Sequence, residues 1–294
     1  MIKKIVYIFL GVIALIALFI ISVFIVRALM GSDESSFSRK TGVGLVEVKG
    51  MILDSEETIR QLRYFAKQDS VKVVVLRVDS PGGVVAPSQE IYSEVKKFAA
   101  KKKIIVSMGS LAASGGYYIS APATSIYANP GTITASIGVL LSFSNIESLM
   151  DKIGIKSYTL KSGEYKDAGS ASREMSKEDR AMFQSVIDNT HEQFVRAVAE
   201  GRKLSLEDVR EIADGRILSG EQAKTLKLVD KLGSLQDAID EAGRLSGISG
   251  DPEIITAPKK KIGILDILTG GIDGMFRGRI DAINSGPRLM YKSE

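Results

Sequence analysis

The stretch VKVVVLRVDSPGG, residues 71–83, decides the fold class of this 294-residue chain. Its first eight residues are almost all β-branched or aliphatic, which is typical of a strand buried on both faces of a sheet. Such a strand belongs to a parallel sheet, because helices then cover both faces. The Pro-Gly-Gly turn that follows brings backbone N–H groups close to a ligand, or serves only as a structural turn; the turn by itself leaves both functions open.

Strand and helix patterns alternate on both sides of this stretch. Residues 43–52 predict a strand, and residues 55–68 predict a helix that begins at Ser55 with acidic residues in its first turn. A second helix is predicted near 87–100 and a third strand at 102–108. We therefore predict an α/β layered fold, with a parallel sheet, right-handed crossovers and flanking helices.

The chain from residue 176 onwards is predicted to be mainly helical. Ser176, Ser205 and Ser219 each stand three positions before an acidic or amide residue, which is the pattern of a capping box at the start of a helix. The first of these helices has an apolar face, and its simplest interpretation is core packing. That face consists of Met182, Phe183, Val186, Ile187, Phe194, Val195 and Val198.

The first 30 residues differ from the rest of the chain. Ile5 to Val26 is a run of 22 residues without a charge, preceded by two lysines and followed by Arg27. A helix of this length spans ~30 Å, the thickness of the hydrocarbon core of a bilayer, and is longer than the ~7–15 apolar residues of a cleavable signal peptide. We expect an uncleaved transmembrane helix whose N-terminus stays in the cytoplasm, because the basic groups before it outnumber the one after it.

The remaining segment boundaries follow from composition. Residues 1–30 form the predicted anchor, and residues 31–41 are small and polar, which predicts a flexible linker. Residues 42–250 are predicted to form the α/β domain. Residues 251–294 are glycine-rich and amphipathic in patches, and we interpret them as a loosely packed C-terminal extension.

The composition excludes several kinds of site. The chain has no cysteine, so disulfides, thiolate nucleophiles and cysteine-based zinc sites are excluded. Its one histidine, His191, falls in a predicted helix and argues against a Ser–His–Asp triad or a histidine-rich metal centre; we expect no metal and no cofactor. Removing Lys3, Lys4 and Arg27 from the 39 basic residues leaves 36 against 35 acidic ones, so we also expect no nucleic-acid partner.

Ser114 is the candidate nucleophile. It lies in GSLAASGGYYIS, residues 109–120, where the small neighbours suit either a serine displayed on a sharp turn or a tight helix contact. A serine nucleophile needs a base, and a lysine is the known substitute for histidine. A free lysine titrates near ~10.4, but burial in an apolar site lowers a lysine pKa by up to ~3–5 units. Lys166, in a polar loop between a predicted strand and the long helix, is either this base or an ordinary solvated lysine.

Four motifs together resemble the signal peptide peptidase A family in its short, single-repeat, membrane-bound form. They are DSPGG (79–83), GSLAASGGYYIS (109–120), GTITASIGV (131–139) and KSGEYKDAGS (161–170), and the resemblance covers roughly residues 42–250 and the PRLMY end. It implies a ClpP/crotonase fold. It also implies Ser114 as nucleophile, Lys166 as general base, Gly83 and Gly115 as the oxyanion hole, and Ser136 as a hydroxyl that orients the lysine.

The resemblance further implies a serine endopeptidase that degrades remnant signal peptides and other unstructured peptides. It would be a single-pass protein of the bacterial inner membrane, in contact with lipid, with its catalytic domain on the extracytoplasmic side. Two-repeat members are expected to take the serine and the lysine from different repeats, so a single-repeat chain is expected to form a closed homo-oligomeric ring. The alternatives are an acyl-CoA hydratase-type enzyme on the same fold and a non-catalytic membrane scaffold.

Overall fold

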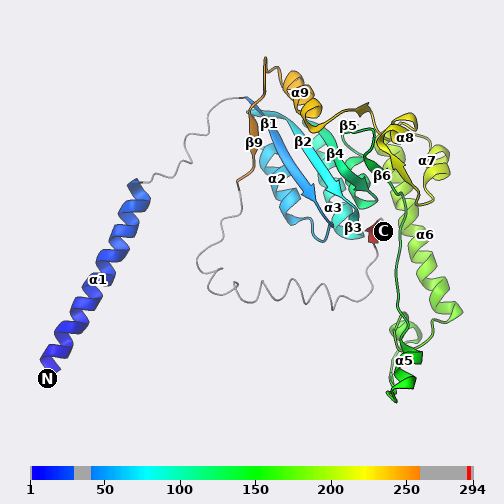
Figure 1. The fold of residues 1–294 in the computed structure, drawn as a ribbon, viewed down its shortest axis with the longest axis horizontal. Coiled ribbons are helices and arrows are strands. Elements are labelled where there is room, and N and C mark those ends of the chain that lie inside the picture. Colours follow the sequence, from blue (N-terminus) through cyan, green and yellow to red (C-terminus); the bar gives the residue numbers. More distant parts are fainter. Residues whose placement is uncertain (1, 30–40, 259–289, 293–294) are drawn as a thin grey trace. The chain divides into compact units, whose positions relative to one another are not determined.

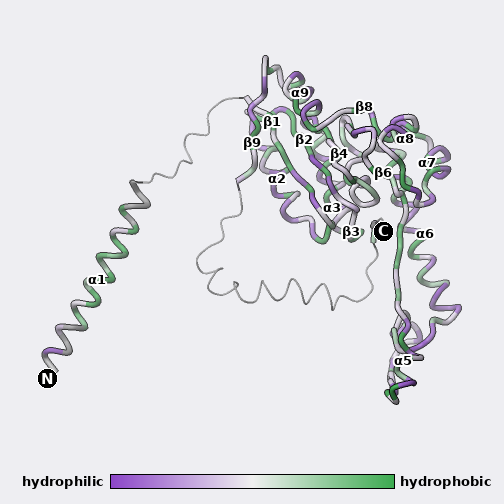
Figure 2. The backbone as a smooth tube through the Cα atoms, in the orientation of Figure 1, coloured by the Kyte–Doolittle hydropathy of each residue, from purple (hydrophilic) through white to green (hydrophobic). Residues whose placement is uncertain are grey.

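The computed structural model describes residues 2–29, 41–258 and 290–292 (Figure 1). The chain divides into two compact units, Met1–Lys40 and Thr41–Glu294. The first unit contains one helix, α1 (Ile2–Leu29), which is coloured mainly as hydrophobic in Figure 2 and exposes large apolar side chains such as Phe9 and Leu15. Within the described residues, no helix combines the length and the apolarity needed to cross a membrane.

The second unit alternates strands and helices as the sequence predicts. Its described strands are β1 (Gly42–Lys49), β2 (Val71–Ser80), β3 (Gly82–Val84), β4 (Lys103–Ala113), β5 (Ser125–Ala128), β6 (Ile133–Ala135), β7 (Ile217–Ser219), β8 (Lys231–Leu232), β9 (Ile254–Thr256) and β10 (Met290–Lys292). Its described helices are α2 (Glu56–Ala66), α3 (Val85–Ala99), α4 (Gly115–Ser120), α5 (Glu147–Lys152), α6 (Lys177–Arg202), α7 (Leu206–Ile212), α8 (Gly220–Thr225), α9 (Leu235–Ser246) and the short 3₁₀ helix η1 (Glu164–Asp167).

The main sheet has eight strands among the described residues. Its principal order is β7-β6-β4-β2-β1-β9; β5 also pairs with β4, and β8 pairs with β5. Every pair in this sheet is parallel except β6 with β7. The predicted parallel α/β fold is therefore confirmed. A second, two-stranded antiparallel sheet is formed by β3 and β10.

The apolar run of β2 reflects burial on both faces, as predicted. Val73 and Val75 pack in a cluster with α9, whereas Val74, Leu76 and Val78 face the larger core that α2, α3, α4 and α6 complete. Because alternate residues of a strand point to opposite faces, both sets must be apolar to be buried. The free energy of burial on both sides fixes this strand in the centre of the sheet.

The strand β4 organises the edge at which Ser114 lies. It pairs with β2 on one side, and on the other side first with β5 and then, further along, with β6. Two threonines tie β6 to β4: the Thr132 hydroxyl donates to the Gly109 carbonyl at 2.7 Å, and the Thr134 hydroxyl donates to the Ala112 carbonyl at 2.7 Å. The last residue of β4, Ala113, is therefore held firmly where the chain turns into α4.

The helix starts agree in part with the predicted caps. Ser176 and Ser219 form complete capping boxes, and Ser205 accepts a bond from the Asp208 N–H without a reciprocal contact. Ser55 makes no cap bond with its side chain, because its hydroxyl instead bonds the carboxylate of Glu90.

The apolar face of α6 belongs to the core over only part of its length. Phe194, Val195 and Val198 are buried as predicted, but Val186 is 47% exposed. The difference arises because the N-terminal half of α6 extends past the sheet (Figure 1). There Phe183 packs against Phe143, with ring centroids 4.6 Å apart. The core interpretation is therefore wrong for the first half of this face.

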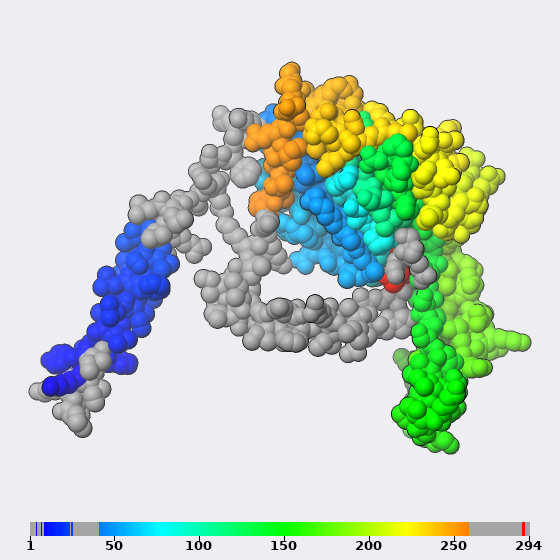
Figure 3. Space-filling model, in the orientation of Figure 1, coloured from blue at the N-terminus to red at the C-terminus, as the bar shows by residue number. Residues whose placement is uncertain are grey.

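Residues 139–175 form an arm that projects from the body of the second unit (Figures 1 and 3). The arm contains α5 and η1, and no residue of either helix is buried. The strand expected before Lys166 is absent, since residues 153–161 adopt no regular structure. A segment so poor in buried apolar contacts gains little stability from its own chain.

Candidate active site

Ser114 stands on a strained turn between β4 and α4. Its φ of 53° and ψ of −117° are unusual for a residue with a side chain, and the surrounding hydrogen bonds hold it there. Its N–H donates to the Ala135 carbonyl at 2.7 Å, and its carbonyl accepts from the Tyr118 N–H at 2.8 Å. Ser114 is 1% exposed, and its Oγ has no hydrogen-bond partner among the described residues. A sharp strand-to-helix turn of this kind is how many hydrolases present a nucleophilic serine.

The backbone of β3 packs directly against the residue after Ser114. A Cβ added to Gly115 would stand 3.1 Å from the Gly83 nitrogen, and a Cβ added to Gly82 would stand 2.5 Å from the Gly115 nitrogen. Gly82 also has a φ of +95°, which L side chains rarely adopt. These glycines let the backbone nitrogens of Gly83 and Gly115 come close to each other next to the serine. Acyl transfer needs such donors where the carbonyl oxygen gains charge.

The first residues of the DSPGG motif shape this turn, a role that sequence analysis missed. The Asp79 carboxylate accepts from the Leu111 N–H at 3.1 Å and so ties β2 to the end of β4. The Ser80 hydroxyl accepts from the Gly82 N–H at 3.1 Å. Serine commonly bonds a backbone group two residues on, so its presence before Pro-Gly-Gly is the signal that could have identified Ser80 as a turn residue. The Asp79 bond joins two strands, and no local pattern indicates it.

The strand β10 lies along the same glycines. Tyr291 stands opposite Gly83 in the β10–β3 register, and Met290 also forms a bridge with Leu140. The Tyr291 ring is fully buried against Tyr118 and Phe194, and burial raises the pKa of its hydroxyl. Local sequence patterns could not show this contact, because it joins positions about 200 residues apart in the chain.

Ser136 lies next to the residue that holds Ser114. It follows β6 with a φ of 50°, it is buried, and its N–H donates to the Arg216 carbonyl at 3.0 Å. Ser136 lines a pocket of about 510 Å³ together with Leu140, Asp188, His191 and Asp214, among others. The Nε2 atom of His191 is buried there and has no hydrogen-bond partner among the described residues.

Lys166 is the one predicted site residue that the single chain leaves apart. It lies in η1 on the arm and its side chain is exposed. Because the Ser114 Oγ has no partner in the described chain, Lys166 does not hydrogen-bond to it. The neighbouring Lys161 is engaged, since its Nζ donates to the Glu164 carbonyl and to Asp167, both at 2.7 Å. No contact of the Lys166 ammonium is seen in the described residues.

The structure thus brings together four of the five predicted site residues. Ser114, Gly83, Gly115 and Ser136 meet at the carboxyl ends of β2, β4 and β6, whereas Lys166 is carried elsewhere. Among the described residues, no group of acidic and histidine side chains is arranged to hold a metal ion. A serine nucleophile beside two backbone donors is suited to acyl transfer.

The chain is similar to several proteases. Residues 96–249 match the model of peptidase family S49, and residues 47–134 match that of Clp protease. The chain is 40% identical over 235 residues to a putative protease of Synechocystis, which covers 80% of this chain and 85% of that protein. It is 38% identical to a putative signal peptide peptidase SppA of Enterococcus faecium (70% of this chain, 64% of the relative) and 34% identical to Protease 4 of Salmonella typhi (83% and 41%).

These matches include both sides of the turn on which Ser114 stands, and they join it to the segment that carries Lys166. The Synechocystis relative is matched over most of its own length, so the likeness is not confined to one motif. The chain belongs to peptidase family S49 and is an SppA-like serine protease.

Proposed function

We propose that this chain is a membrane-anchored Ser–Lys endopeptidase that degrades remnant signal peptides. The observation that carries the proposal is the Oγ of Ser114, which has no partner among the described residues and is buried on a strained turn next to the backbone nitrogens of Gly83 and Gly115. A buried hydroxyl without a partner is costly and is rarely kept for structural reasons. Its missing partner is the base.

The chemistry needs one proton acceptor. The Ser114 oxygen attacks the peptide carbonyl carbon, and the neutral Lys166 amine takes the serine proton. The oxyanion accepts hydrogen bonds from Gly83 and Gly115. The lysine then gives the proton to the leaving amine, and water hydrolyses the acyl-enzyme with the same base. The Ser136 hydroxyl orients the lysine throughout.

Lys166 reaches the serine of a second copy in this proposal. No residue of the arm is buried, and several of its large apolar side chains are exposed in the single chain: Leu149, Ile153, Ile155, Tyr158 and Leu160. Contiguous apolar surface of this kind marks an interaction site. If each arm serves the next copy, every contact completes one site and leaves another open, so the assembly closes as a ring.

Mixing inactive variants tests the shared site. Chains carrying Ser114→Ala and chains carrying Lys166→Ala are co-refolded or exchanged, and peptide hydrolysis is measured. Mixed rings are expected to regain part of the activity, since some interfaces pair an intact serine with an intact lysine. No recovery despite verified subunit exchange would place both residues of the dyad in one chain.

A serine-directed acylating probe tests the nucleophile. We expect a covalent adduct on Ser114, with labelling lost in Ser114→Ala and retained in His191→Gln, because the histidine is not the base. A probe adduct on another residue, or an active Ser114→Ala protein, would contradict the peptidase mechanism. Digestion of synthetic signal peptides, compared with folded proteins as controls, tests the substrate class; the name of the Enterococcus relative supports it.

The membrane anchor is proposed from the sequence of the first unit. The sequence favours it, since Ile5 to Val26 carries no charge, although no described helix meets the requirements for a span. We propose a single-pass protein of the bacterial inner membrane with its catalytic domain outside the cytoplasm. Retention of the full chain in carbonate-washed membranes, and its digestion by protease added to spheroplasts, are the expected results. Extraction by carbonate would contradict an integral anchor.

A further inference from the structure

The four-residue helix η1 has no core of its own to hold it. None of its residues is buried, and its backbone bonds, such as that from the Lys166 N–H to the Gly163 carbonyl at 3.2 Å, stay within the loop. A base must nevertheless stand within hydrogen-bond reach of its serine, and a misplacement of about 1 Å costs about 10²-fold in rate. Something outside η1 must therefore fix its position.

The Asp167 carboxylate, next to Lys166 in the chain, is gripped from two sides. Arg173 forms a two-pronged contact with it, from Nη2 to Oδ1 at 2.9 Å and from Nε to Oδ2 at 3.1 Å. Lys161 adds a third bond, from Nζ to Oδ1 at 2.7 Å. Paired bonds between guanidinium and carboxylate fix direction as well as distance. The Asp167 side chain is only 11% exposed.

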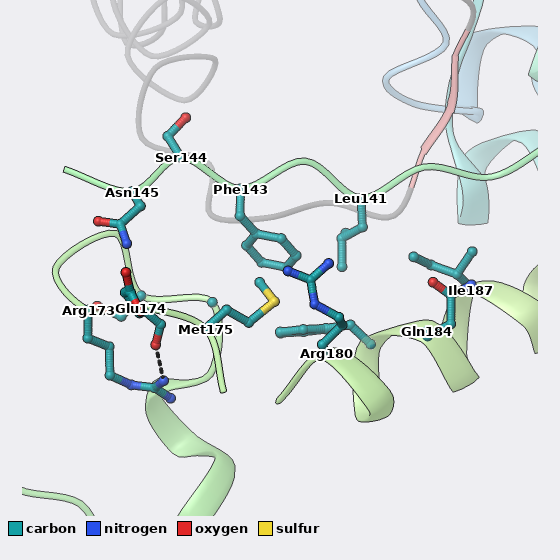
Figure 4. A pocket seen from close by; sticks show the side chains of 13 residues that line it. Leu141, Phe143, Ser144, Asn145, Arg173, Glu174, Met175, Arg180, Gln184 and Ile187 are labelled. Carbon is teal, nitrogen blue, oxygen red and sulfur yellow. Dashed lines mark hydrogen bonds between the residues drawn. The ribbon is translucent and has the colours of Figure 1, made fainter. Parts of the chain in front are cut away.

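Arg173 connects this carboxylate to a rigid element. Its Nη1 donates to the Asp179 carboxylate at 2.6 Å and to the Glu174 carbonyl at 2.8 Å. Asp179 is buried. It is the third residue of α6 and forms a capping box with Ser176 at the start of that helix. Figure 4 shows Arg173 at the edge of an open pocket, pointing away from Phe143 and Arg180. Arg173 thus connects η1 to the 26-residue helix α6, which holds it in position.

The same contacts also pair the negatively charged Asp167 carboxylate, the neighbour of Lys166 in the chain, with Arg173 and Lys161. The Arg173 guanidinium, followed by Lys161, holds the pKa of the Asp167 carboxyl well below its usual range, so the carboxylate is fully charged at neutral pH. A carboxylate of this kind near a free ammonium would stabilise the charged lysine. Here it is paired with two other cations instead.

We propose that Arg173 is a positioning residue for the lysine base: it locks η1 to the start of α6 and keeps the Asp167 carboxylate away from the Lys166 ammonium. The inference rests on the proposed function, in which Lys166 is the base. Arg173 itself touches neither the serine nor the peptide bond.

Several other titratable groups lie close to Lys166 and Asp167 in the sequence. Glu164 and Tyr165 belong to η1, Glu174 precedes α6, and Arg180 lies in its first turns. In the copy that receives the lysine, the pocket beside Ser136 adds Asp188, His191 and Asp214. The variants below change none of these groups, so a difference between variants reports on the Arg173–Asp167 contact.

The experiment is a pH–rate profile of the full-length assembled protein with an internally quenched peptide of apolar residues. In Arg173→Gln, kcat is expected to fall about 10- to 100-fold. The rising limb is expected to move to higher pH by about half a unit or more, because the Asp167 carboxylate then keeps only its bond to Lys161 and stabilises the Lys166 ammonium more strongly. In Arg173→Gln combined with Asp167→Asn, the limb is expected to return while kcat stays low. Arg173→Lys keeps the positive charge but loses the two-pronged contact with Asp167. The rising limb of its pH–rate profile is therefore expected to stay near that of the parent protein.

The controls separate the possible failures. Arg244→Gln removes a similar contact, to Glu241 on α9, and is expected to change neither kcat nor the limb. A low kcat in Arg173→Gln with an unmoved limb, or no change in either, would overturn the proposal, and thermal denaturation identifies a variant that does not fold. If Arg173→Gln does not fold, Arg173→Lys takes its place as the test. An unchanged kcat in Arg173→Lys would then overturn the proposal that Arg173 positions the lysine. An active Lys166→Ala protein would instead refute the base assignment in the proposed function.

Discussion

The two ends of the proposed dyad are built in opposite ways. Ser114 follows the long central strand β4, is buried, and is held by bonds to Ala135 and Tyr118. Lys166 lies on an arm without a buried residue in either of its helices, and is positioned through a few charged contacts. The position of Ser114 is therefore fixed by packing of the core. The position of Lys166 is fixed by local contacts and, in the proposed assembly, by the copy against which the arm docks.

This contrast explains how a strained nucleophile and an adaptable base can coexist. Strain at the serine persists only where surrounding structure over-determines the backbone, which the sheet does. A segment that completes a site in another copy must instead stay accessible until assembly, and low local stability is the usual price of that accessibility. Variants placed at each end of the dyad test this difference.

The largest effect is expected for the base. Lys166→Ala should lower the rate of peptide hydrolysis by several orders of magnitude, because none of the described residues of the chain offers the Ser114 hydroxyl another hydrogen-bonded base. Its thermal stability should stay within ~0.5 kcal/mol of the parent, since the side chain is exposed. Lys156→Ala, another exposed arm lysine, is the matched control and should keep its activity. Comparable losses in both variants would mean that the arm, rather than this lysine, is what matters.

The next largest effect is expected at the fixed end. Gly115→Ala should lower kcat by about 10²–10³-fold, because the new Cβ would stand 2.8 Å from the Ser88 hydroxyl and 3.1 Å from the Gly83 nitrogen, and must displace one of the two donors. Gly131→Ala is the control, since a Cβ there meets nothing within 4 Å. Steady-state kinetics and a thermal melt on both variants check this. A fully active Gly115→Ala protein would remove Gly115 from the oxyanion hole.

The difference between the two ends also decides what could be predicted from sequence. The run at 71–78 and the small residues around Ser114 encode the buried strand, the turn and the helix after it, because each depends on local chemistry. The contact of Tyr291 with Gly83 depends on chain that returns from a distance, and no periodicity encodes it. The missing strand before Lys166 shows the same limit: a strand-like pattern forms no strand where no neighbouring edge is available to pair with it.

A milder effect is expected at Ser136, which follows Ala135, the residue whose carbonyl accepts the Ser114 N–H. Ser136→Ala should lower kcat about 10-fold or somewhat more, because a hydroxyl that orients the base is lost while the base itself is kept. Ser172→Ala, on the arm, tests whether any serine near the dyad behaves alike, and should be close to neutral since the hydrogen bonds of Ser172 within the described part of the chain go to Ser170. Side-by-side kcat measurements suffice. A loss as large as that of Lys166→Ala would show that Ser136 takes part in the proton transfer itself.

The smallest effect on the fold is expected at the tip of the arm, and there the contrast is sharpest. Leu160 is fully exposed in one chain, so Leu160→Ser should change the free energy of unfolding by no more than ~0.5 kcal/mol. Leu76→Ala, in the core strand β2, should cost about 2–5 kcal/mol. Chemical denaturation compares the two.

If the arm docks on a second copy, Leu160→Ser should shift sedimentation toward smaller species, because association is weakened while the fold is kept. Its activity should fall at low protein concentration and recover at high concentration. An arm that packs on its own chain would instead show the Leu160 variant losing stability in a concentration-independent way, and the lysine would then have to reach its serine without a partner.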